Sequence, residues 1–283
     1  AVPSVVGVNV NPYLNLGEME NKGVDASLEY YKTINKDWNI SVRGNFTYNR
    51  NKKLYDDQPS ANYPYKDVIG KPWNQQFGYI ALGYFKTESE IQNSPKQIGN
   101  PRVGDLKYKD INGDGVIDDN DKVAIGATKK PNFTYGFGVS AKWKGLDVNV
   151  HFQGVGKSTY FINGSTVYMF SGGNSDGDGW GNVMKEMAEG NRWILGVNED
   201  PNAEYPRLTY GKNDNNNRAS TYWLRNGAYL RLKTLDIGYT LPASLVRKAH
   251  MNTVRIFFTG TNLLTFSKFK LWDPEMGSST GKS

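Results

Sequence analysis

Residues 133–154 have the sequence FTYGFGVSAKWKGLDVNVHFQG, in which apolar and polar side chains alternate along both halves. In the first half the apolar positions run from Phe133 to Trp143, separated by Thr, Gly, Ser and Lys. In the second half Asp, Asn, His and Gln separate the apolar positions from Leu146 to Phe152. A period of two predicts strands with one apolar and one polar face. The Lys-Gly pair between the halves predicts a tight hairpin turn.

The same alternation occurs in two further pairs of segments. Residues 24–31 and 38–49 form the first pair, and residues 229–241 and 253–264 form the second. In segment 229–241 the apolar parity changes beside Lys233, which predicts a β-bulge there. The connection before residue 253 contains a short helical pattern, ASLVRKAH. The sequence therefore predicts an all-β fold built from three antiparallel hairpins.

Long connections separate the hairpins, at about residues 50–132 and 157–222, and both are rich in Asn, Gly, Asp and Pro. Short turns that alternate with long loops are typical of outer-membrane barrels, and loops of this length are uncommon in compact domains. Alternation by itself also fits a β-sandwich, whose polar faces meet solvent. Segments of about 10 to 12 residues exceed the usual strand length, which favours the barrel. Aromatic residues near the segment ends favour it too: Trp38, Tyr48, Phe133, Trp143 and Tyr239.

The composition agrees with a β-rich protein and argues against several other classes. The chain of 283 residues is 13% aromatic, with 18 Tyr and 7 Trp, and it has no apolar run of about 18 residues that could cross a bilayer as a helix. Without cysteine, disulfides and thiolate metal sites are excluded. The net charge is +6, but Lys and Arg are scattered, so no nucleic-acid binding is expected. The opening AVPSVVGVNV has no basic segment or cleavage pattern, so no signal peptide is expected.

An aspartate-rich segment, DINGDGVIDDND at residues 110–121, has the spacing of an EF-hand calcium loop. Gly115 occupies the sixth position, where such a loop turns sharply, and Ile117 would anchor the loop to a core. Asp replaces the usual Glu at the twelfth position, and the flanking segments lack a helical pattern. The alternative is an exposed turn that binds no metal. The candidate ligands are Asp110, Asn112, Asp114, the carbonyl group of Val116, Asp118 and Asp121.

The sequence contains few residues in patterns typical of catalytic sites. Its two histidines, His151 and His250, lie outside any nucleophile or metal motif. The Gly-rich segment 171–182 lacks the Gly-Lys-Ser/Thr ending of a phosphate-binding loop. Paired carboxylates for glycoside hydrolysis leave no linear signature, because their spacing is spatial. We therefore expect no enzymatic activity.

Aromatic residues are frequent in the second long loop, among Asn, Asp and Arg. Aromatic faces beside polar groups are suited to stacking on sugar rings or holding peptides. The alternative is that these rings pack the loop against itself or against a partner protein. The weak substrate-binding candidates are Trp180, Trp193, Tyr205 and Trp223.

Five phrases, in order along nearly the whole chain, resemble the SusC/RagA family of TonB-dependent outer-membrane transporters of Bacteroidetes. The resemblance implies an antiparallel transmembrane β-barrel segment, part of a 22-stranded barrel with long extracellular loops. It also implies that residues 1–283 are a C-terminal portion of that barrel and that the plug domain is absent from this chain. The phrases are NLGEMENKGVDASLEY (15–30), VGDLKYKDINGDGVIDDNDKVAIG (103–126), PNFTYGFGVSAKWKGLDVNVHFQG (131–154), LRNGAYLRLKTLDIGYTLP (224–242) and TGTNLLTFSKFKLWDPE (259–275).

The resemblance implies import across the cell outer membrane. TonB would supply energy through the N-terminal plug region, and a SusD-like surface lipoprotein would help the external loops to capture a glycan or an oligopeptide. The outer face would contact membrane lipid and lipopolysaccharide. Calcium is the one cofactor considered, as a clip that orders an external loop. The polar residues expected to face the lumen are Asp25, Glu29, Arg43, Asp147, Asn149, His151 and Arg255.

Two other functions are compatible with the same alternation. The first is a secreted β-sandwich binding module with one structural calcium loop, which would be extracted without detergent. The second is a cell-surface adhesin, which would have no plug domain encoded upstream. A barrel would need detergent for its extraction, because its apolar face meets lipid.

Overall fold

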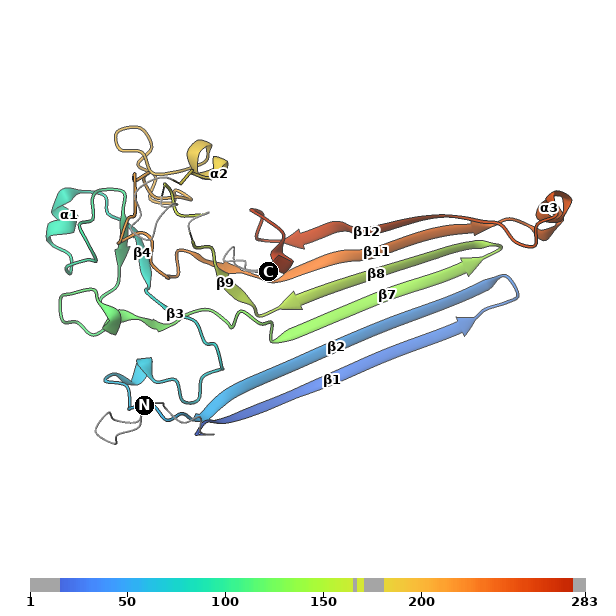
Figure 1. Cartoon of the computed structure of the whole chain (residues 1–283), viewed down its shortest axis with the longest axis horizontal. Coiled ribbons are helices and arrows are strands. Elements are labelled where there is room, and N and C mark those ends of the chain that lie inside the picture. The colour runs from blue at the N-terminus through green and yellow to red at the C-terminus, as the bar shows by residue number, and fades with distance from the viewer. Residues whose placement is uncertain (1–15, 165–166, 171–180, 277–283) are drawn as a thin grey trace, which may run out of the picture.

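The computed structural model describes residues 16–164, 167–170 and 181–276, and its main feature is one six-stranded antiparallel sheet (Figure 1). Strands that are neighbours in the sheet are also successive among these six strands, so the sheet is an up-and-down meander. The predicted all-β class and the three hairpins are confirmed. In sheet order the strands are β1 (Glu18–Thr33), β2 (Trp38–Tyr55), β7 (Phe133–Trp143), β8 (Leu146–Gly156), β11 (Tyr229–Thr240) and β12 (Arg255–Ser267).

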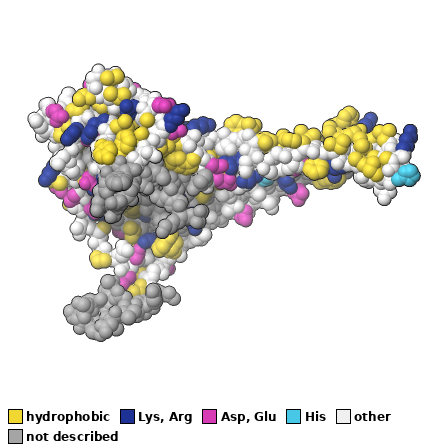
Figure 2. All heavy atoms as spheres, turned by 45° about the horizontal axis from the view of Figure 1, so that its top comes forward, with side chains coloured by type: hydrophobic (Ala, Val, Ile, Leu, Met, Phe, Trp, Pro, Cys, Tyr) yellow, Lys and Arg dark blue, Asp and Glu magenta, His cyan; other side chains and the backbone are white. Residues whose placement is uncertain are grey.

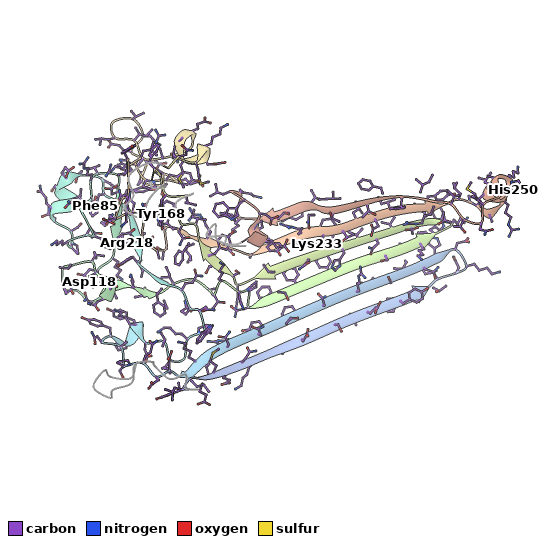
Figure 3. All side chains as sticks on the ribbon, viewed as in Figure 1. Phe85, Asp118, Tyr168, Arg218, Lys233 and His250 are labelled. Carbon is purple, nitrogen blue, oxygen red and sulfur yellow. The ribbon has the colours of Figure 1, made fainter. Side chains whose placement is uncertain are left out.

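One end of the sheet, the turn end, carries only short connections. Residues 34–37 join β1 to β2, and residues 144–145 join β7 to β8 with positive φ angles at both positions. The third connection contains α3 (Ala243–Val246) and η4 (Arg247–Ala249), so the predicted short helix is confirmed. Figure 3 shows His250 at the tip of this connection.

The opposite end, the loop end, carries two long connections. Residues 56–132 join β2 to β7, and residues 157–228 join β8 to β11. The first loop therefore begins later than predicted, because β2 continues to Tyr55, and the second ends later, at the start of β11. Figure 3 shows Asp118 within this loop region, far from the turn end.

The two faces of the sheet have opposite chemistry. Leu28 on β1 is 73% exposed and Ile256 on β12 is 65% exposed, and Figure 2 shows hydrophobic side chains gathered along the arm that the strands form. Among the described residues no second sheet of comparable size packs on this apolar face. No helix of the described ranges is long and apolar enough to cross a membrane.

Aromatic residues lie near both ends of the apolar face. At the turn end Trp38 is paired with Trp143, and their rings stack with centroids 5.6 Å apart. At the loop end the Phe133 ring lies beside those of Phe46 and Tyr135, with centroids 6.2 and 6.1 Å away. From Phe133 to Trp143 a strand spans about 33 Å, or about 25 Å after a tilt of about 40°. That height matches the apolar band of a membrane barrel.

Glycines of β8 allow the aromatic rings of β7 to lie flat on the apolar face. Tyr135 is opposite Gly154 and Phe133 is opposite Gly156 in the β7–β8 register. A Cβ at Gly154 would lie 2.4 Å from the Tyr135 ring, and one at Gly156 would lie 2.1 Å from the Phe133 ring. A ring laid over a glycine restores the packing that the missing side chain would have provided.

The two loops fold together into a compact region with its own short elements. Three two-stranded sheets pair β3 with β6, β4 with β5, and β9 with β10. The strands are β3 (Phe77–Gly78), β4 (Ala81–Tyr84), β5 (Leu106–Tyr108), β6 (Val123–Ala124), β9 (Thr159–Phe161) and β10 (Leu224–Asn226). The helices are η2 (Pro64–Lys66), α1 (Glu88–Gln92), η3 (Asp119–Asp121) and α2 (Lys185–Glu189).

Strand β11 contains one bulge and one buried arginine that holds the segment after β12. The register shifts between Leu232 and Thr234, so the bulge predicted beside Lys233 is confirmed. Arg231, only 2% exposed, binds Asp273 and Glu275, the latter at 2.6 Å, and so ties η5 (Pro274–Met276) to the sheet.

Candidate functional site

The polar face of the sheet carries all seven residues predicted to face the lumen. In antiparallel strands, directly opposite residues share a face. Glu29 is opposite Arg43, Arg43 is opposite Gly138, and Gly138 is opposite His151. Asp25 lies four residues before Glu29 on β1, and Asp147 and Asn149 lie four and two residues before His151 on β8, so they share this face. Arg255 joins the group through its ion pair with Asp147.

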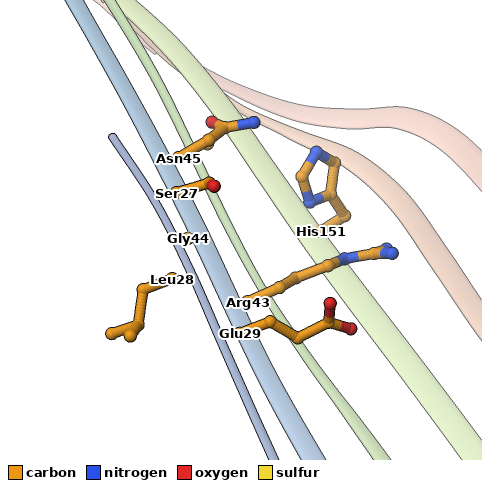
Figure 4. A pocket seen from close by; sticks show the side chains of 8 residues that line it. Ser27, Leu28, Glu29, Arg43, Gly44, Asn45 and His151 are labelled. Atoms are coloured by element: carbon orange, nitrogen blue, oxygen red, sulfur yellow. The ribbon is translucent and has the colours of Figure 1, made fainter. Parts of the chain in front are cut away.

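Glycines on β7 open a shallow recess in the polar face. Gly136 lines the recess, and a Cβ there would lie 2.7 Å from Asn45 Oδ1 and 3.4 Å from His151 Cε1. The recess has a volume of about 270 Å³, and Figure 4 shows Glu29, Arg43 and His151 on one side of the strands and Leu28 on the other. His151 Nδ1 is buried without a hydrogen-bond partner among the described residues. The recess therefore presents the charged groups of Glu29 and Arg43 to whatever lies above this face, with the His151 imidazole beside them.

A hydrogen-bonded network continues along the same face. Ser140 Oγ donates to Asn149 Oδ1 at 2.8 Å, and Asn149 Nδ2 donates to Asp236 Oδ2 at 3.1 Å. Thr47 Oγ1 donates to Asp25 Oδ1 at 2.9 Å. Such a surface is suited to water rather than to lipid, because buried polar groups need partners that lipid tails cannot supply.

The aspartate-rich segment forms a tight loop held by its own hydrogen bonds. Asp110 accepts from the backbone N–H groups of Gly113 and Gly115 at 2.7 and 2.8 Å. Asp121 is fully buried and accepts from the N–H groups of Ile111 and Asp118 at 2.7 and 2.8 Å. The remaining predicted ligands, Asn112, Asp114, Val116 and Asp118, lie on the same loop, within residues 110–121.

The loop has the oxygen ligands that calcium prefers, but its carboxylates already accept hydrogen bonds from backbone N–H groups. Within the described ranges no group of three or more His, Cys, Asp or Glu side chains is arranged to hold a metal ion. Ile117 is 3% exposed, and its N–H donates to the Lys96 carbonyl at 2.8 Å, which anchors the loop as expected. Calcium binding by this loop stays a prediction.

The aromatic residues proposed to contact substrate are core residues instead. Trp193, Tyr205 and Trp223 are each 1% exposed. Trp193 packs with Tyr84 in one apolar cluster, and Tyr205 and Trp223 belong to a second. The prediction is therefore wrong for these three, because their rings stabilise the loop region and have no free face. Trp180 lies outside the described residues.

Comparison with known proteins gives a consistent result, although no family model matches the chain. It is 28% identical over 287 residues to TonB-dependent receptor P3 of Formosa agariphila, covering 97% of this chain and 27% of that protein. It is 24% identical over 286 residues to TonB-dependent receptor SusC of Bacteroides thetaiotaomicron, covering 96% and 26%. The structure of the RagAB peptide transporter matches with a TM-score of 0.66 at 27% identity, covering 98% of this chain and 29% of that chain. The resemblance to the SusC/RagA family is confirmed.

The match to SusC/RagA proteins covers nearly all of this chain but only part of each relative. The RagAB peptide importer in the open-open state matches with a TM-score of 0.68 at 28% identity, and the match covers 28% of that chain. This chain spans little more than a quarter of the length of the curated relatives it matches. The fold is that of a barrel segment with long loops, and among the described residues the sheet is open, with β1 and β12 as its edges.

The sequence patterns missed the residue that joins the two loops of this SusC/RagA-like chain. Asp105, in the first loop, is 1% exposed. Its carboxylate accepts from Arg207 Nη2 at 2.9 Å, Asn213 Nδ2 at 3.2 Å and Asn216 Nδ2 at 2.8 Å, all from the second loop. No local motif could have indicated this cluster, because Asp105 lies more than a hundred residues before its three partners.

Tyrosine hydroxyls add further links between the two loops. Tyr84 donates to the Ala203 carbonyl at 2.8 Å and shares a 2.8 Å hydrogen bond with Tyr222. Burial raises the pKa of Tyr84 to about 12. The hydroxyl therefore stays protonated at neutral pH and keeps its donor role.

Proposed function

We propose that this chain is part of an outer-membrane importer for glycans or oligopeptides, powered by TonB and assisted by a SusD-like surface lipoprotein. The observation that carries the proposal is the open sheet with one exposed apolar face and one charged face, with all long loops at one end. In a barrel, the apolar face meets lipid and lipopolysaccharide, and the polar face lines the lumen. The resemblance to receptors and to a peptide transporter supports the same conclusion.

The polar face supports passage of a hydrophilic substrate. Acidic and basic residues alternate across it, with Glu29 beside Arg43 and Asp147 beside Arg255. A wall with both signs of charge and few apolar side chains holds water and offers no strong trap for a neutral polar solute. In this arrangement the seven polar residues line the inside of the barrel beside a plug.

The loop region supports a capture role outside the cell. It has two apolar cores of its own, and the buried Asp105 carboxylate with its three partners forms a charged hub between the two loops. The region is therefore a folded surface rather than a set of separate connections. Folded surfaces of this kind can hold a partner protein in a defined orientation. In our proposal the lipoprotein docks on this region and calcium orders the loop at residues 110–121.

The sandwich alternative needs a second sheet on the apolar face. The described residues form no such sheet, and Leu28, Phe258 and Ile256 remain 57% to 73% exposed. Exposing that many large apolar side chains to water would be costly, at about 25 cal/mol per Å². Lipid contact removes this cost, which favours the barrel.

The test is extraction of outer membranes that contain the native protein, followed by gel electrophoresis with and without boiling. We expect a detergent-dependent band far heavier than 31.7 kDa that shifts on boiling, and a surface lipoprotein that copurifies with a tagged transporter. A water-soluble species with no heat shift would overturn the proposal and favour the calcium-binding sandwich.

A further inference from the structure

A second and larger recess lies where the polar face of the sheet meets the loop region. Its volume is about 620 Å³, large enough for several sugar or amino-acid residues. Asn21 is opposite Asn51, and Gly23 is opposite Asn49, so Asn21, Asn49 and Asn51 continue the polar rows of β1 and β2. The residues that line it are Met19, Asn21, Asn49, Asn51, Trp73, Asn74, Thr128, Lys129, Lys130, Pro131 and Asn132.

Hydrogen bonds between three separate chain segments fix the walls of this recess. Asn51 Oδ1 accepts from the Trp73 N–H at 2.7 Å, which ties the first loop to β2. The Asn49 N–H donates to the Asn132 carbonyl at 2.9 Å, and Asn132 Nδ2 donates to the Asn49 carbonyl at 3.1 Å. Asn74 has a φ of 61°, which a short polar side chain tolerates better than most. The recess is therefore built before any ligand arrives, which reduces the entropy cost of binding.

Several side chains that line the recess have unused hydrogen-bonding capacity. The amide groups of Asn21, Asn49 and Asn74 make no hydrogen bond among the described residues. Each amide offers two donors and an acceptor. That combination matches the vicinal hydroxyls of a sugar, which both donate and accept.

An exposed indole ring lies beside these amide groups in the recess. Trp73 is 49% exposed, and Lys53 Nζ lies 4.8 Å from the centroid of its ring. The cation holds one side of the indole by a cation–π contact. The exposed part of the ring offers an apolar surface beside the free amides, the arrangement that binds the C–H face of a pyranose.

The charged residues that line the recess are all basic. Lys129 and Lys130 both line the recess, and none of its eleven lining residues is Asp or Glu. The Lys130 ammonium makes no ion pair within the described ranges. An anionic group on the ligand would be attracted here. The smaller recess of about 270 Å³ has no such preference, because Glu29 lies beside Arg43 there.

We propose that this recess binds an oligosaccharide that carries carboxylate or sulfate groups, as an early site on the import path. The proposal rests on the proposed function, which makes the polar face the luminal wall. A peptide is less suited, because extended peptides are recognised by a free strand edge with pockets for alternate side chains. This recess instead offers side-chain amides on the face of the pleat, with Met19, Trp73 and Pro131 as its only large apolar groups.

The experiment is isothermal titration of the full-length transporter, purified in detergent, with four probes. They are tri-galacturonate, a sulfated carrageenan tetrasaccharide, maltotriose and tri-glutamate. We expect at least one acidic sugar to bind more tightly than maltotriose and tri-glutamate, with an affinity that falls as salt rises. Failure of both acidic sugars to bind, or equal or tighter binding of maltotriose or tri-glutamate, would overturn the proposal.

Variants locate the site. Trp73→Ala and the double variant Asn21→Ala/Asn49→Ala are each expected to weaken binding about tenfold or more, the equivalent of one lost stacking or amide contact group. Lys130→Gln is expected to weaken it less and to reduce its salt dependence. The matched controls are Asn39→Ala, on the same face of β2 but outside both recesses, and Lys142→Gln, near the turn end of β7.

The readouts separate this inference from the proposed function. If the variants bind like the wild type, the recess is not the site, and a heat-shifted barrel with its copurified lipoprotein leaves the importer standing. If the wild type itself shows no heat shift and is water-soluble, the proposed function fails first. All variants are checked for the heat shift, so a folding defect is not mistaken for lost binding.

Discussion

Arg255 on β12 reaches across the intervening strand β11 to pair with Asp147 on β8. Arg255 Nε donates to Asp147 Oδ1 at 3.0 Å, and the second guanidinium nitrogen binds Oδ2. The guanidinium lies directly over Gly238 of β11, where a Cβ would come within 2.2 Å of it. The glycine thus allows a two-point ion pair to span three strands of the polar face.

Substitution of Gly238 by Ala should separate this pair. The new methyl group displaces the guanidinium, and overfilling a packed position costs about 1–3 kcal/mol. We expect a lower midpoint for the heat-induced gel shift of the barrel. Gly44→Ala is the control, because the nearest atom to its Cβ would be 3.8 Å away. Equal midpoints for the two variants would show that the pair has room to move aside.

A charge on the apolar face should weaken membrane insertion. Leu28→Arg places a cation opposite lipid near the middle of β1, which costs about 2–4 kcal/mol at the bilayer midplane. The matched control is Ser27→Arg, one residue away and on the polar face. Urea unfolding in lipid vesicles is expected to show a clearly lower free energy of unfolding for Leu28→Arg only. A similar loss for both would argue against lipid contact on this face.

Removal of the Asp105 carboxylate should loosen both loops. Asp105→Ala leaves Arg207 and two asparagine amides without their acceptor, and breaking a buried pair costs about 3–5 kcal/mol. We expect rapid protease cleavage in residues 56–132 and in residues 157–228, while the barrel keeps its heat shift. Asp214→Ala, which removes an exposed carboxylate, is the control. Wild-type protease resistance in Asp105→Ala would contradict the role of this hub.

Calcium should protect the loop at residues 110–121 from proteolysis at millimolar concentration, the range of extracellular sites. Chelation is expected to speed cleavage there. Asp114→Asn should abolish the difference, because the amide keeps the acceptor for the Val116 N–H but removes the charge. If chelation changes nothing in the wild type, the loop is held by its own hydrogen bonds.

The segment after β12 should detach in acid. The hydrogen bond from Arg231 holds the pKa of Asp273 below its ordinary value of 3.8. A lowered pKa contributes stability that is complete above the ordinary value and is lost as the pH falls through the lowered one. We expect Trp272 fluorescence to be steady from neutral pH to about pH 4 and to change below that. The signal is isolated by subtraction of Trp272→Phe.

Asp273→Asn tests the cause of that transition. The amide cannot be charged, so its spectrum at neutral pH should resemble that of the wild type in acid. A wild-type transition near pH 6 would exclude Asp273 as the titrating group.

Local patterns predicted the parts of the fold that depend on neighbours along the chain. The period of two fixed which residues share a face, and the parity change located the bulge beside Lys233. The spacing of Asp and Gly predicted a loop at residues 110–121, either around calcium or as an exposed turn. The structure has a tight loop there, in which Asp110 accepts from the N–H groups of Gly113 and Gly115.

Contacts between distant segments escaped the sequence. The sequence left open whether Trp193 and Trp223 face solvent or pack within the loops. Trp193 is buried against residues of the other long loop, and Trp223 lies in a cluster of its own loop that Phe269, from after β12, completes. The recess around Trp73 combines three segments, and nothing in any one of them indicates a cavity. Such features follow from packing in three dimensions, which periodicity does not report.

The hub at Asp105 limits the exchange of single loops between this chain and related chains. Its carboxylate comes from the first loop and all three of its side-chain partners come from the second. A chimaera that receives one of these loops from another protein keeps only half of this cluster and leaves a buried charge without its partners. The two loops therefore behave as one structural unit, and an exchange between related chains keeps this cluster intact only when both loops are moved together.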